Sequence, residues 1–263
     1  MTRRLVVLGG GRMGEALIGG LVSSAWAPVG ELCVVDRRAE RRDELVARFP
    51  GLEVSATPPP AEGVVVAVKP GDVEEACRAV AAAGCARVLS IAAGVPLATL
   101  EASLGAVPVV RAMSNTAARV GAGVAAIAPG SRAGRDELAW AEGVLGAVGE
   151  VVRVPEPLLD AVTGLSGSGP AYVFLLAEAL VDAGVTAGLP HEISSRLAVQ
   201  TLVGAARLLV ETGLPPAALR AEVTSPGGTT AAGLRALEAG GLRSAVLEAV
   251  IAATARSREL GTR

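Results

Sequence analysis

The first half of the chain alternates short apolar runs with longer segments of helical periodicity. Runs of strand length occur at 4–8, 32–35, 64–68, 87–91 and 107–110, and helix-like segments lie between them at 13–22, 39–49, 72–82 and 96–104. Further runs at 123–127 and 150–154, with a helical segment at 135–145, extend the pattern. Such alternation is typical of βαβ units, in which strands pair in parallel and helices cover both faces of the sheet. We therefore predict an α/β fold with a parallel, doubly wound sheet.

The pattern changes after Pro155 and Pro157. From there only helical periodicity remains, at 158–165, 171–185, 190–211, 216–223, 229–239 and 242–259. We therefore predict two domains, a sheet domain over 1–154 and an all-α domain over 155–263.

The segment 171–185 reads AYVFLLAEALVDAGV and is apolar on most of its faces. A helix this apolar is usually surrounded by other helices. Those helices could belong to a bundle within one chain or to a second copy of the chain. We favour the second interpretation, in which this helix lies in a dimer interface.

The composition limits the classes of partner. Aromatic residues make up only 2% of the 263 residues, so the core must be built from Ala, Val and Leu. The net charge of −2 offers no attraction to nucleic acid or to an anionic membrane, and we expect neither as a partner.

We find no window that stays apolar and free of charge for the ~18 residues that a membrane helix needs. The N-terminal MTRRLVVL is interpreted as a first strand rather than a signal peptide, because glycines follow Leu8.

Cysteine, histidine and lysine are scarce. Cys33, Cys77 and Cys85 show no CxxC spacing and are interpreted as small core residues in a reducing cytoplasm. The chain has one histidine, His191, and one lysine, Lys69. A catalytic triad built on histidine and a histidine-rich metal site are therefore nearly excluded, and we expect no metal.

The first strand is followed by a glycine-rich loop, VVLGGGRMGEALIGGL. Gly9, Gly11 and Gly14 have GxGxxG spacing, between a strand and a helix. Glycines at these positions let the backbone approach a pyrophosphate, which then faces the N-terminus of the helix. Asp36 ends the next strand, close to the ~20 residues expected for an acidic ribose contact. A glycine-rich turn that binds nothing is the alternative, but the context favours a Rossmann-like dinucleotide site that also includes Arg12 and Met13.

The residues after the second strand leave the choice of cofactor open. Asp36 could accept hydrogen bonds from a ribose 2′-hydroxyl, which would favour NAD(H). Arg37 and Arg38 could bind a 2′-phosphate, which would favour NADP(H), although a solvated helix start also explains them. We take NADP(H) as the favoured cofactor and NAD(H) as the alternative.

Several motifs, in order along the chain, resemble those of the 1-pyrroline-5-carboxylate reductase family. They are LGGGRMGEALIGGL, VVVAVKPGDV, LSIAAGVPL, VVRAMSNTAARVGAG, LDAVTGLSGSGPAYVFLLAEALVDAGV and LRAEVTSPGGTTAAGLRALE. The resemblance covers nearly the whole chain. The RxMPNTP segment of the family has two prolines that Ser114 and Ala117 replace here, whereas Asn115 and Thr116 are kept.

The resemblance implies a reaction and a set of site residues. The reaction would be reduction of a cyclic C=N bond by a nicotinamide hydride, which yields L-proline. The cofactor would contact Val68, Lys69, Pro70, Ala93 and Asn115 in addition to the glycine loop. The family also implies that the all-α domains of two subunits intertwine, and that such dimers can build larger rings.

The segment SPGGTT is the predicted substrate site. Placed before a helix, it offers free N–H groups that could bind a carboxylate, although the spacing alone favours plain helix capping by Ser225 or Thr229. The resemblance favours the substrate carboxylate, with the Thr230 hydroxyl reaching the imine nitrogen as the catalytic group. The predicted substrate contacts are Ser225, Gly227, Gly228, Thr229 and Thr230.

Two other functions fit parts of the sequence. A reductase of another cyclic imine acid would need the same motifs and a pocket of different size. A dinucleotide sensor without catalysis would need the glycine loop but not SPGGTT. A related β-hydroxyacid dehydrogenase would use a lysine in its helical half, and no lysine follows Lys69.

Overall fold

A computed structural model describes residues 2–261 of the chain. The chain forms two compact units. One reaches to Ser168 and also takes in the chain from Ala252 onward, and the other is Gly169–Ile251. Each unit is considered by itself below.

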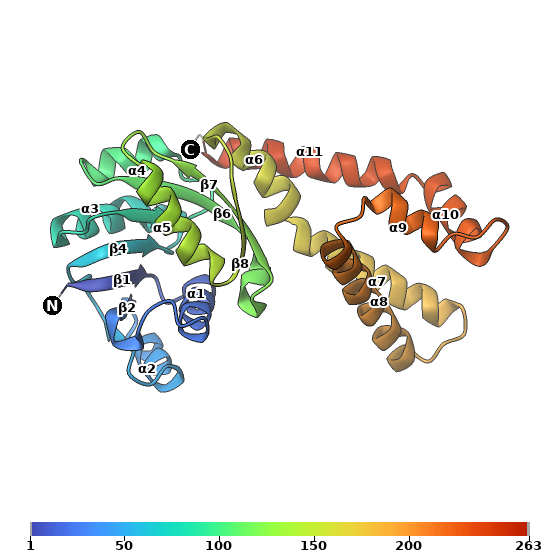
Figure 1. The fold of residues 1–263 in the computed structure, drawn as a ribbon, viewed down its shortest axis with the longest axis horizontal. Coiled ribbons are helices and arrows are strands. Elements are labelled where there is room, and N and C mark those ends of the chain that lie inside the picture. Colours follow the sequence, from blue (N-terminus) through green and yellow to red (C-terminus); the bar gives the residue numbers. More distant parts are fainter. Residues whose placement is uncertain (1, 262–263) are drawn as a thin grey trace. The chain divides into compact units, whose positions relative to one another are not determined.

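The first unit is built around one eight-stranded sheet (Figure 1). Its strands stand in the order β3-β2-β1-β4-β5-β6-β7-β8. Their bounds are β1 Arg3–Leu8, β2 Leu32–Val35, β3 Glu53–Ser55, β4 Ala61–Val66, β5 Val88–Ser90, β6 Val109–Ser114, β7 Gly123–Pro129 and β8 Gly149–Arg153. The chain moves outward from β1 through β2 to β3 and then returns to place β4 on the other side of β1. This reversal is the position at which doubly wound sheets bind their ligands.

The sheet departs from the predicted parallel arrangement at one pair of strands. β6 and β7 pair antiparallel, whereas the other pairs are parallel. Only Asn115–Ala122 connects these two strands, and a parallel crossover needs a dozen residues or more. β7 and β8 are parallel again because a helix, α5, connects them.

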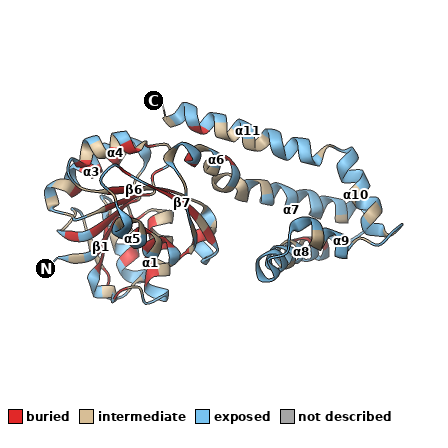
Figure 2. Cartoon of the chain, turned by 45° about the horizontal axis from the view of Figure 1, so that its top comes forward, coloured by how far each residue is buried: buried red, intermediate tan, exposed pale blue. Residues whose placement is uncertain are grey.

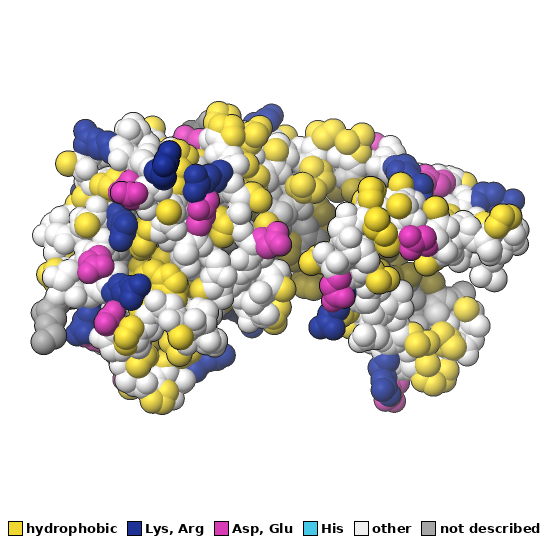
Figure 3. Space-filling model, in the orientation of Figure 1, with side chains coloured by type: hydrophobic (Ala, Val, Ile, Leu, Met, Phe, Trp, Pro, Cys, Tyr) yellow, Lys and Arg dark blue, Asp and Glu magenta, His cyan; other side chains and the backbone are white. Residues whose placement is uncertain are grey.

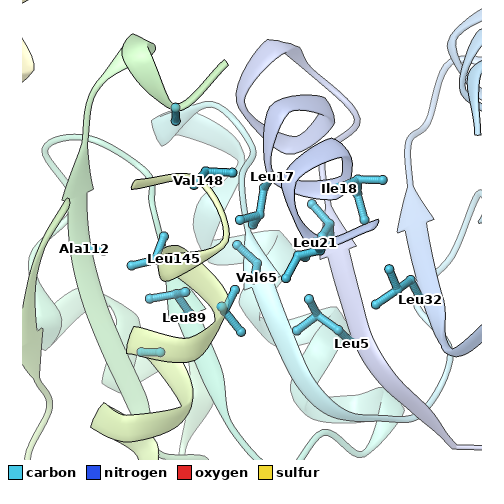
Figure 4. Close-up of a cluster of buried hydrophobic side chains, with 14 of the residues drawn as sticks. Leu5, Leu17, Ile18, Leu21, Leu32, Val65, Leu89, Ala112, Leu145 and Val148 are labelled. Carbon is cyan, nitrogen blue, oxygen red and sulfur yellow. The ribbon is translucent and has the colours of Figure 1, made fainter. Parts of the chain in front are cut away.

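Helices cover both faces of the sheet, as the sequence pattern predicted. Their bounds are α1 Arg12–Ser23, α2 Ala39–Arg48, α3 Val73–Ala83, α4 Leu97–Leu104, α5 Arg135–Gly146 and α6 Leu159–Val162. Side chains of α1, α2 and α5 pack against one face, and those of α3, α4 and α6 against the other. Figure 4 shows Leu17 and Leu21 of α1 and Leu145 of α5 over the strand residues of the first face. The cluster consists of aliphatic side chains, as the low aromatic content requires.

The second unit consists of helices only. They are α7 Gly169–Thr186, α8 His191–Thr212, α9 Pro216–Glu222, α10 Thr229–Ala239 and the first part of α11, Leu242–Gly261. The segment after Ala252 in α11 belongs to the first unit, where the Ser257 hydroxyl donates a 2.6 Å hydrogen bond to Asp160.

The helical unit has almost no core of its own. Of residues 169–251, all of which the structure describes, only Ser194 and Ala198 are buried. Helix α7 has no buried residue, so the interpretation as a bundle core within one chain was wrong. Figure 2 shows these helices largely exposed, and Figure 3 shows hydrophobic side chains at the surface of the unit.

Two described segments are long and apolar enough to cross a membrane. They are Glu156–Thr186 and His191–Thr212. Neither segment contains a charge-free window of the ~18 residues that the sequence-based prediction required. Helices buried in the core of a soluble protein satisfy the same test of length and composition, so it indicates little by itself.

Candidate functional site

The predicted cofactor residues of the first unit meet along one edge of the sheet. The strand ladders align Leu8 with Val35 and Val66, and Val66 with Ser90. The residues that follow these strands therefore share the carboxyl edge. They are Gly9–Gly14, Asp36–Arg38, Val68–Pro70, Ala93 and, after β6, Asn115.

The glycine loop approaches the neighbouring strand end very closely. The φ angle of Gly9 is +108°, and a Cβ atom there would lie 2.6 Å from the Ala67 carbonyl oxygen. A Cβ on Gly14 would overlap the Gly9 carbonyl oxygen. These two glycines are therefore required by the turn itself and by the packing of helix α1 on the sheet.

Gly11 is different, because the protein around it leaves space. A Cβ on Gly11 would meet no atom within 4 Å, and its φ of −67° suits any residue. Gly11 is also the N-cap of α1, where no side chain caps the free N–H groups. An open surface of backbone N–H groups at a helix N-terminus fits a pyrophosphate. The loop therefore has the space and the donors that a dinucleotide requires.

Asp36 ties the glycine loop to the end of β2. Its Oδ2 accepts a 3.1 Å hydrogen bond from the Gly10 N–H, and its Oδ1 accepts one of 3.0 Å from the Arg38 N–H. The Arg38 side chain also lies 3.4 Å from Oδ1. Asp36 thus has a structural role in addition to the predicted ribose contact.

Arg41 of α2, which no sequence motif indicated, fixes the glycine loop from a second side. The Arg41 Nε donates a 2.6 Å hydrogen bond to the Gly10 carbonyl oxygen. The same guanidinium pairs with Glu15 in the first turn of α1 and with Glu44, while Arg48 also pairs with Glu15. Arg41 and Glu15 are 17% and 16% exposed, so this pair is shielded from water. The hydrogen bond to Glu44 raises the pKa of the Arg41 guanidinium above its ordinary value. The hydrogen bond to Glu15 raises it by a smaller amount.

Arg37 extends toward a different element. Its guanidinium lies 3.0 Å from Glu75 and 3.9 Å from Asp72, at the start of α3. The Arg37 side chain is 65% exposed, so these ion pairs contribute little to stability.

The rest of this edge is made of strand ends. Lys69 and Ala93 are exposed. The Asn115 side chain accepts a 3.3 Å hydrogen bond from the Val124 N–H, so it fixes the connection from β6 to β7. Ser90 ends β5, is fully buried, and its hydroxyl has no hydrogen-bond partner among the described residues.

Arg111 and the single histidine, His191, lie apart from the predicted cofactor and substrate contacts. The Arg111 guanidinium pairs with Glu156 at 2.8 Å, and Glu156 also accepts a 2.7 Å hydrogen bond from the Leu97 N–H at the start of α4. Arg111 is therefore a structural residue.

His191 is exposed at the first position of α8. No group of three or more metal-ligating side chains occurs within residues 2–261.

The predicted substrate residues lie together in the helical unit, at the start of α10. Gly228 is the N-cap and no side chain caps it, so the free N–H groups of this helix point to the loop Ser225–Gly228. Gly227 has a φ of +71°, which a residue with a side chain rarely adopts. A Cβ on Gly228 would overlap the Ser225 hydroxyl oxygen. Plain capping by Ser225 or Thr229 is absent, and the terminus can bind an anion instead.

A second sequence motif, TGLSG, forms a short π-helix over Thr163–Gly167. The hydroxyls of Thr163 and Ser166 donate to carbonyl oxygens four residues earlier, at 2.8 and 3.1 Å. A Cβ on Gly167 would overlap the end of the Met113 side chain. Such π-bulges are rare and frequently occur at functional sites.

Family models match both halves of the chain. Residues 4–94 match the family described as NADP oxidoreductase, coenzyme F420-dependent, and residues 156–260 match the family described as pyrroline-5-carboxylate reductase dimerisation. The chain is 45% identical to a pyrroline-5-carboxylate reductase of Synechocystis, covering 99% of both chains. It is 39% identical to an enzyme of the same name from Arabidopsis thaliana, covering 96% of this chain and 94% of the relative.

Solved structures agree with these matches. A pyrroline-5-carboxylate reductase of Coxiella burnetii superposes with a TM-score of 0.92 at 35% identity, covering 99% of both chains. A pyrroline carboxylate reductase of Plasmodium falciparum, solved with NADP bound, gives a TM-score of 0.84 at 27% identity and 98% coverage of both chains.

Proposed function

Because the chain belongs to the pyrroline-5-carboxylate reductase family, we propose that it reduces 1-pyrroline-5-carboxylate to L-proline, the last step of proline biosynthesis. It is an NAD(P)H-dependent oxidoreductase. The single observation that carries the proposal is 45% identity over essentially the whole length of a reductase of that name.

The proposed division of labour follows the two predicted domains. Residues 1–154 bind the dinucleotide and residues 155–263 bind the substrate and the second subunit. A bound reduced nicotinamide supplies the hydride for the imine carbon. The N–H groups at the start of α1 bind the pyrophosphate, with Gly11 leaving room for it. Arg12, Met13, Val68, Lys69, Pro70, Ala93 and Asn115 complete the cofactor contacts.

The substrate carboxylate is bound at the start of α10. Its uncapped N–H groups and the turn made by Gly227 and Gly228 support this assignment. Ser225 and Thr229 add hydroxyl donors beside the same groups. The Thr230 hydroxyl donates to the imine nitrogen and passes a proton to it from solvent, because a threonine is too weak an acid to protonate the nitrogen alone.

NADP(H) is the proposed cofactor, in preference to NAD(H). Both oxygens of the Asp36 carboxylate already accept hydrogen bonds from Gly10 and Arg38, which reduces their capacity for a ribose hydroxyl. Arg37 and Arg38 are largely exposed at the end of β2, where a 2′-phosphate would lie.

Three free cysteines fit a reducing compartment, and we assign the enzyme to the cytoplasm.

The test follows the absorbance of reduced nicotinamide with purified protein and 1-pyrroline-5-carboxylate, separately with NADPH and NADH. Consumption of NADPH with formation of proline is expected. Faster consumption of NADH would assign Asp36 to the ribose. Cofactor binding without consumption of either cofactor would overturn the proposal. It would favour either a reductase with another cyclic imine acid as its substrate or a dinucleotide sensor without catalysis. Assays with larger and smaller cyclic imino acids would distinguish these two alternatives.

Thr230→Ala tests the proposed proton donor. We expect it to lower kcat by about 100-fold or more, the usual range for a lost acid–base group, with cofactor affinity unchanged. Thr224→Ala is the matched control. Thr224 lies in the loop that precedes α10, and its hydroxyl donates to the Arg220 carbonyl oxygen of α9. Equal kinetics of Thr230→Ala and the wild type would remove Thr230 from the mechanism.

A further inference from the structure

A cleft of about 500 Å³ lies at the edge of the sheet opposite the glycine loop. Arg4 lies near the start of β1 and Glu62 near the start of β4, while Glu31 and Arg87 directly precede β2 and β5. The amino ends of these neighbouring parallel strands therefore form its floor. Since β1 spans six residues at ~3.3 Å each, the cleft is about 20 Å from the cofactor loop.

The walls of the cleft are two arginine–tryptophan stacks. The Arg4 guanidinium lies 4.8 Å from the ring centre of Trp26, and that of Arg87 lies 5.0 Å from the ring centre of Trp140. Both distances fall within the range of a cation–π interaction. These are the only two tryptophans in the chain. The stacks hold both guanidinium groups in place, so that a ligand would not have to order them.

The indole rings pack against glycines of the sheet unit, and the Trp140 ring most closely. A Cβ on Gly63 of β4 would lie 2.8 Å from Cε2 of Trp140, so the missing side chain lets the ring lie against the sheet. Trp26 Nε1 would lie 3.5 Å from a Cβ on Gly143 of α5. The glycine at position 63 gives the Trp140 ring a position that a larger residue would block, whereas a Cβ on Gly143 would only reach ordinary van der Waals contact with Trp26.

The charges lining the cleft are balanced but poorly paired. The buried Nε of Arg87 has no hydrogen-bond partner, and its guanidinium forms no ion pair within residues 2–261. Arg4 and Glu31 are 3.8 Å apart, at the limit of an ion pair, and Glu62 has no ionic partner among the described residues. Arg87 and Glu62 therefore line the cleft as one positive and one negative group without an ion-pair partner among the described residues.

We propose that this cleft binds a small zwitterion that carries a carboxylate and an ammonium group, as an amino acid does. The carboxylate would bind Arg87, since a guanidinium offers paired donors that match a carboxylate. The ammonium would bind Glu62. A polyanion is disfavoured by Glu31 and Glu62, and a simple cation by the two arginines. The site is separate from the proposed active site, and its failure would leave the reductase activity untouched.

Tryptophan fluorescence reports the binding directly because both tryptophans line the cleft. The probes are L-glutamine as the zwitterion, inorganic phosphate as an anion and n-butylamine as a cation, each at millimolar concentrations, with calorimetry as a second readout. We expect L-glutamine to change the emission saturably in the full-length wild-type protein. Arg87→Gln and Glu62→Gln should each weaken its binding by about tenfold or more, since each removes a charged hydrogen bond.

Arg78→Gln is the matched control, because Arg78 is an exposed arginine of α3 that pairs with Glu74. It should bind L-glutamine like the wild type. All variants should keep their affinity for NADPH, which shows that the sheet is intact. Absence of L-glutamine binding, or binding of phosphate or n-butylamine as tight as that of L-glutamine, would overturn the proposal. If Arg87→Gln fails to fold, Glu62→Gln alone decides, because Glu62 is exposed.

Discussion

Gly11 and Gly14 of the cofactor loop are glycines for different reasons, and substitution by alanine separates them. A methyl group on Gly14 would overlap the Gly9 carbonyl oxygen, whereas one on Gly11 would meet no protein atom. Gly14→Ala should therefore lower the stability by about 1–3 kcal/mol, as overpacking does. Gly11→Ala should fold with a nearly unchanged Tm but bind NADPH about tenfold more weakly or worse, because its methyl group would occupy the proposed pyrophosphate position. Thermal melting and calorimetric titration measure the two effects.

An unchanged NADPH affinity of Gly11→Ala would contradict the assignment of this loop to the pyrophosphate. Gly146→Ala is a suitable control, since Gly146 lies at the end of α5 and a Cβ there also meets no atom within 4 Å. It should change neither quantity appreciably.

Cys77 gives the fold a dependence on alkaline pH. Burial, with a smaller contribution from nearby Cys85, raises the pKa of its thiol from 9.0 to about 11. The unfolded chain therefore loses this proton at a lower pH than the folded chain. The stability contributed by the thiol is complete below about pH 9 and is lost as the pH rises to about 11.

We expect the free energy of unfolding, measured in urea, to fall over this range more steeply in the wild type than in Cys77→Ala. Burial also raises the pKa of the Cys33 and Cys85 thiols, but both proteins contain these thiols, so the difference between the two curves reports on Cys77. Parallel curves for the two proteins would show that the Cys77 thiol ionises equally in both states.

Helices α7 and α8 approach closely at one point, where Gly184 faces Ser194. The Ser194 hydroxyl donates a 2.7 Å hydrogen bond to the Val181 carbonyl oxygen, and a Cβ on Gly184 would overlap that hydroxyl. Gly184→Ala should destabilise the protein by about 1–3 kcal/mol. Combined with Ser194→Ala, which removes the overlapping oxygen, it should cost less than the sum of the two single substitutions. Additive losses in urea unfolding would mean that the helices separate to accept the methyl group.

Most helices and strands could be predicted from periodicity, because their apolar faces are continuous in the sequence. Strand β3, Glu53–Ser55, was missed because it is a short edge strand with no fully buried residue. The direction of β7 was also wrong, although the short connection before it contained the necessary information. Strand β6 continues to Ser114, beyond the apolar run, since its last residues pair with β7.

The candidate site was predictable where backbone geometry selects the residue type. Gly9 and Gly14 could be found because glycine is required there, whereas at the start of α10 the spacing alone favoured plain capping and only the resemblance favoured a binding site. Arg41 could not be found, because its bonds to Gly10 and Glu15 join residues far apart in the sequence. The only local signal was an acidic residue directly after the glycine loop. The cleft at the opposite edge was likewise hidden, since its arginines and tryptophans come from separate elements and form no motif.

The two units differ in how they bury apolar surface, and this difference bears on the assembly. The sheet unit has a large core on both faces of its sheet. The helical unit exposes large apolar side chains along α7, α8 and α11, including Phe174 at 63%, Leu175 at 66% and Ile251 at 58%. A soluble protein rarely leaves so much apolar surface uncovered. We infer that a second copy of the chain covers these helices, in agreement with the dimerisation family that residues 156–260 match.

Leu175→Glu tests this inference, because it places a charge on the exposed face of α7. The wild type should be a dimer or a ring of dimers by size-exclusion chromatography with light scattering, with a Tm that rises with protein concentration. Leu175→Glu should shift the mass toward the monomer and lower the Tm, since the helical unit has no core to replace the interface. Val46→Glu is the matched control, because Val46 is 50% exposed on α2 of the sheet unit and should leave the mass unchanged. A stable Leu175→Glu oligomer of wild-type mass would show that α7 lies outside the interface, and a monomeric wild type would show that the apolar helices are covered in some other way.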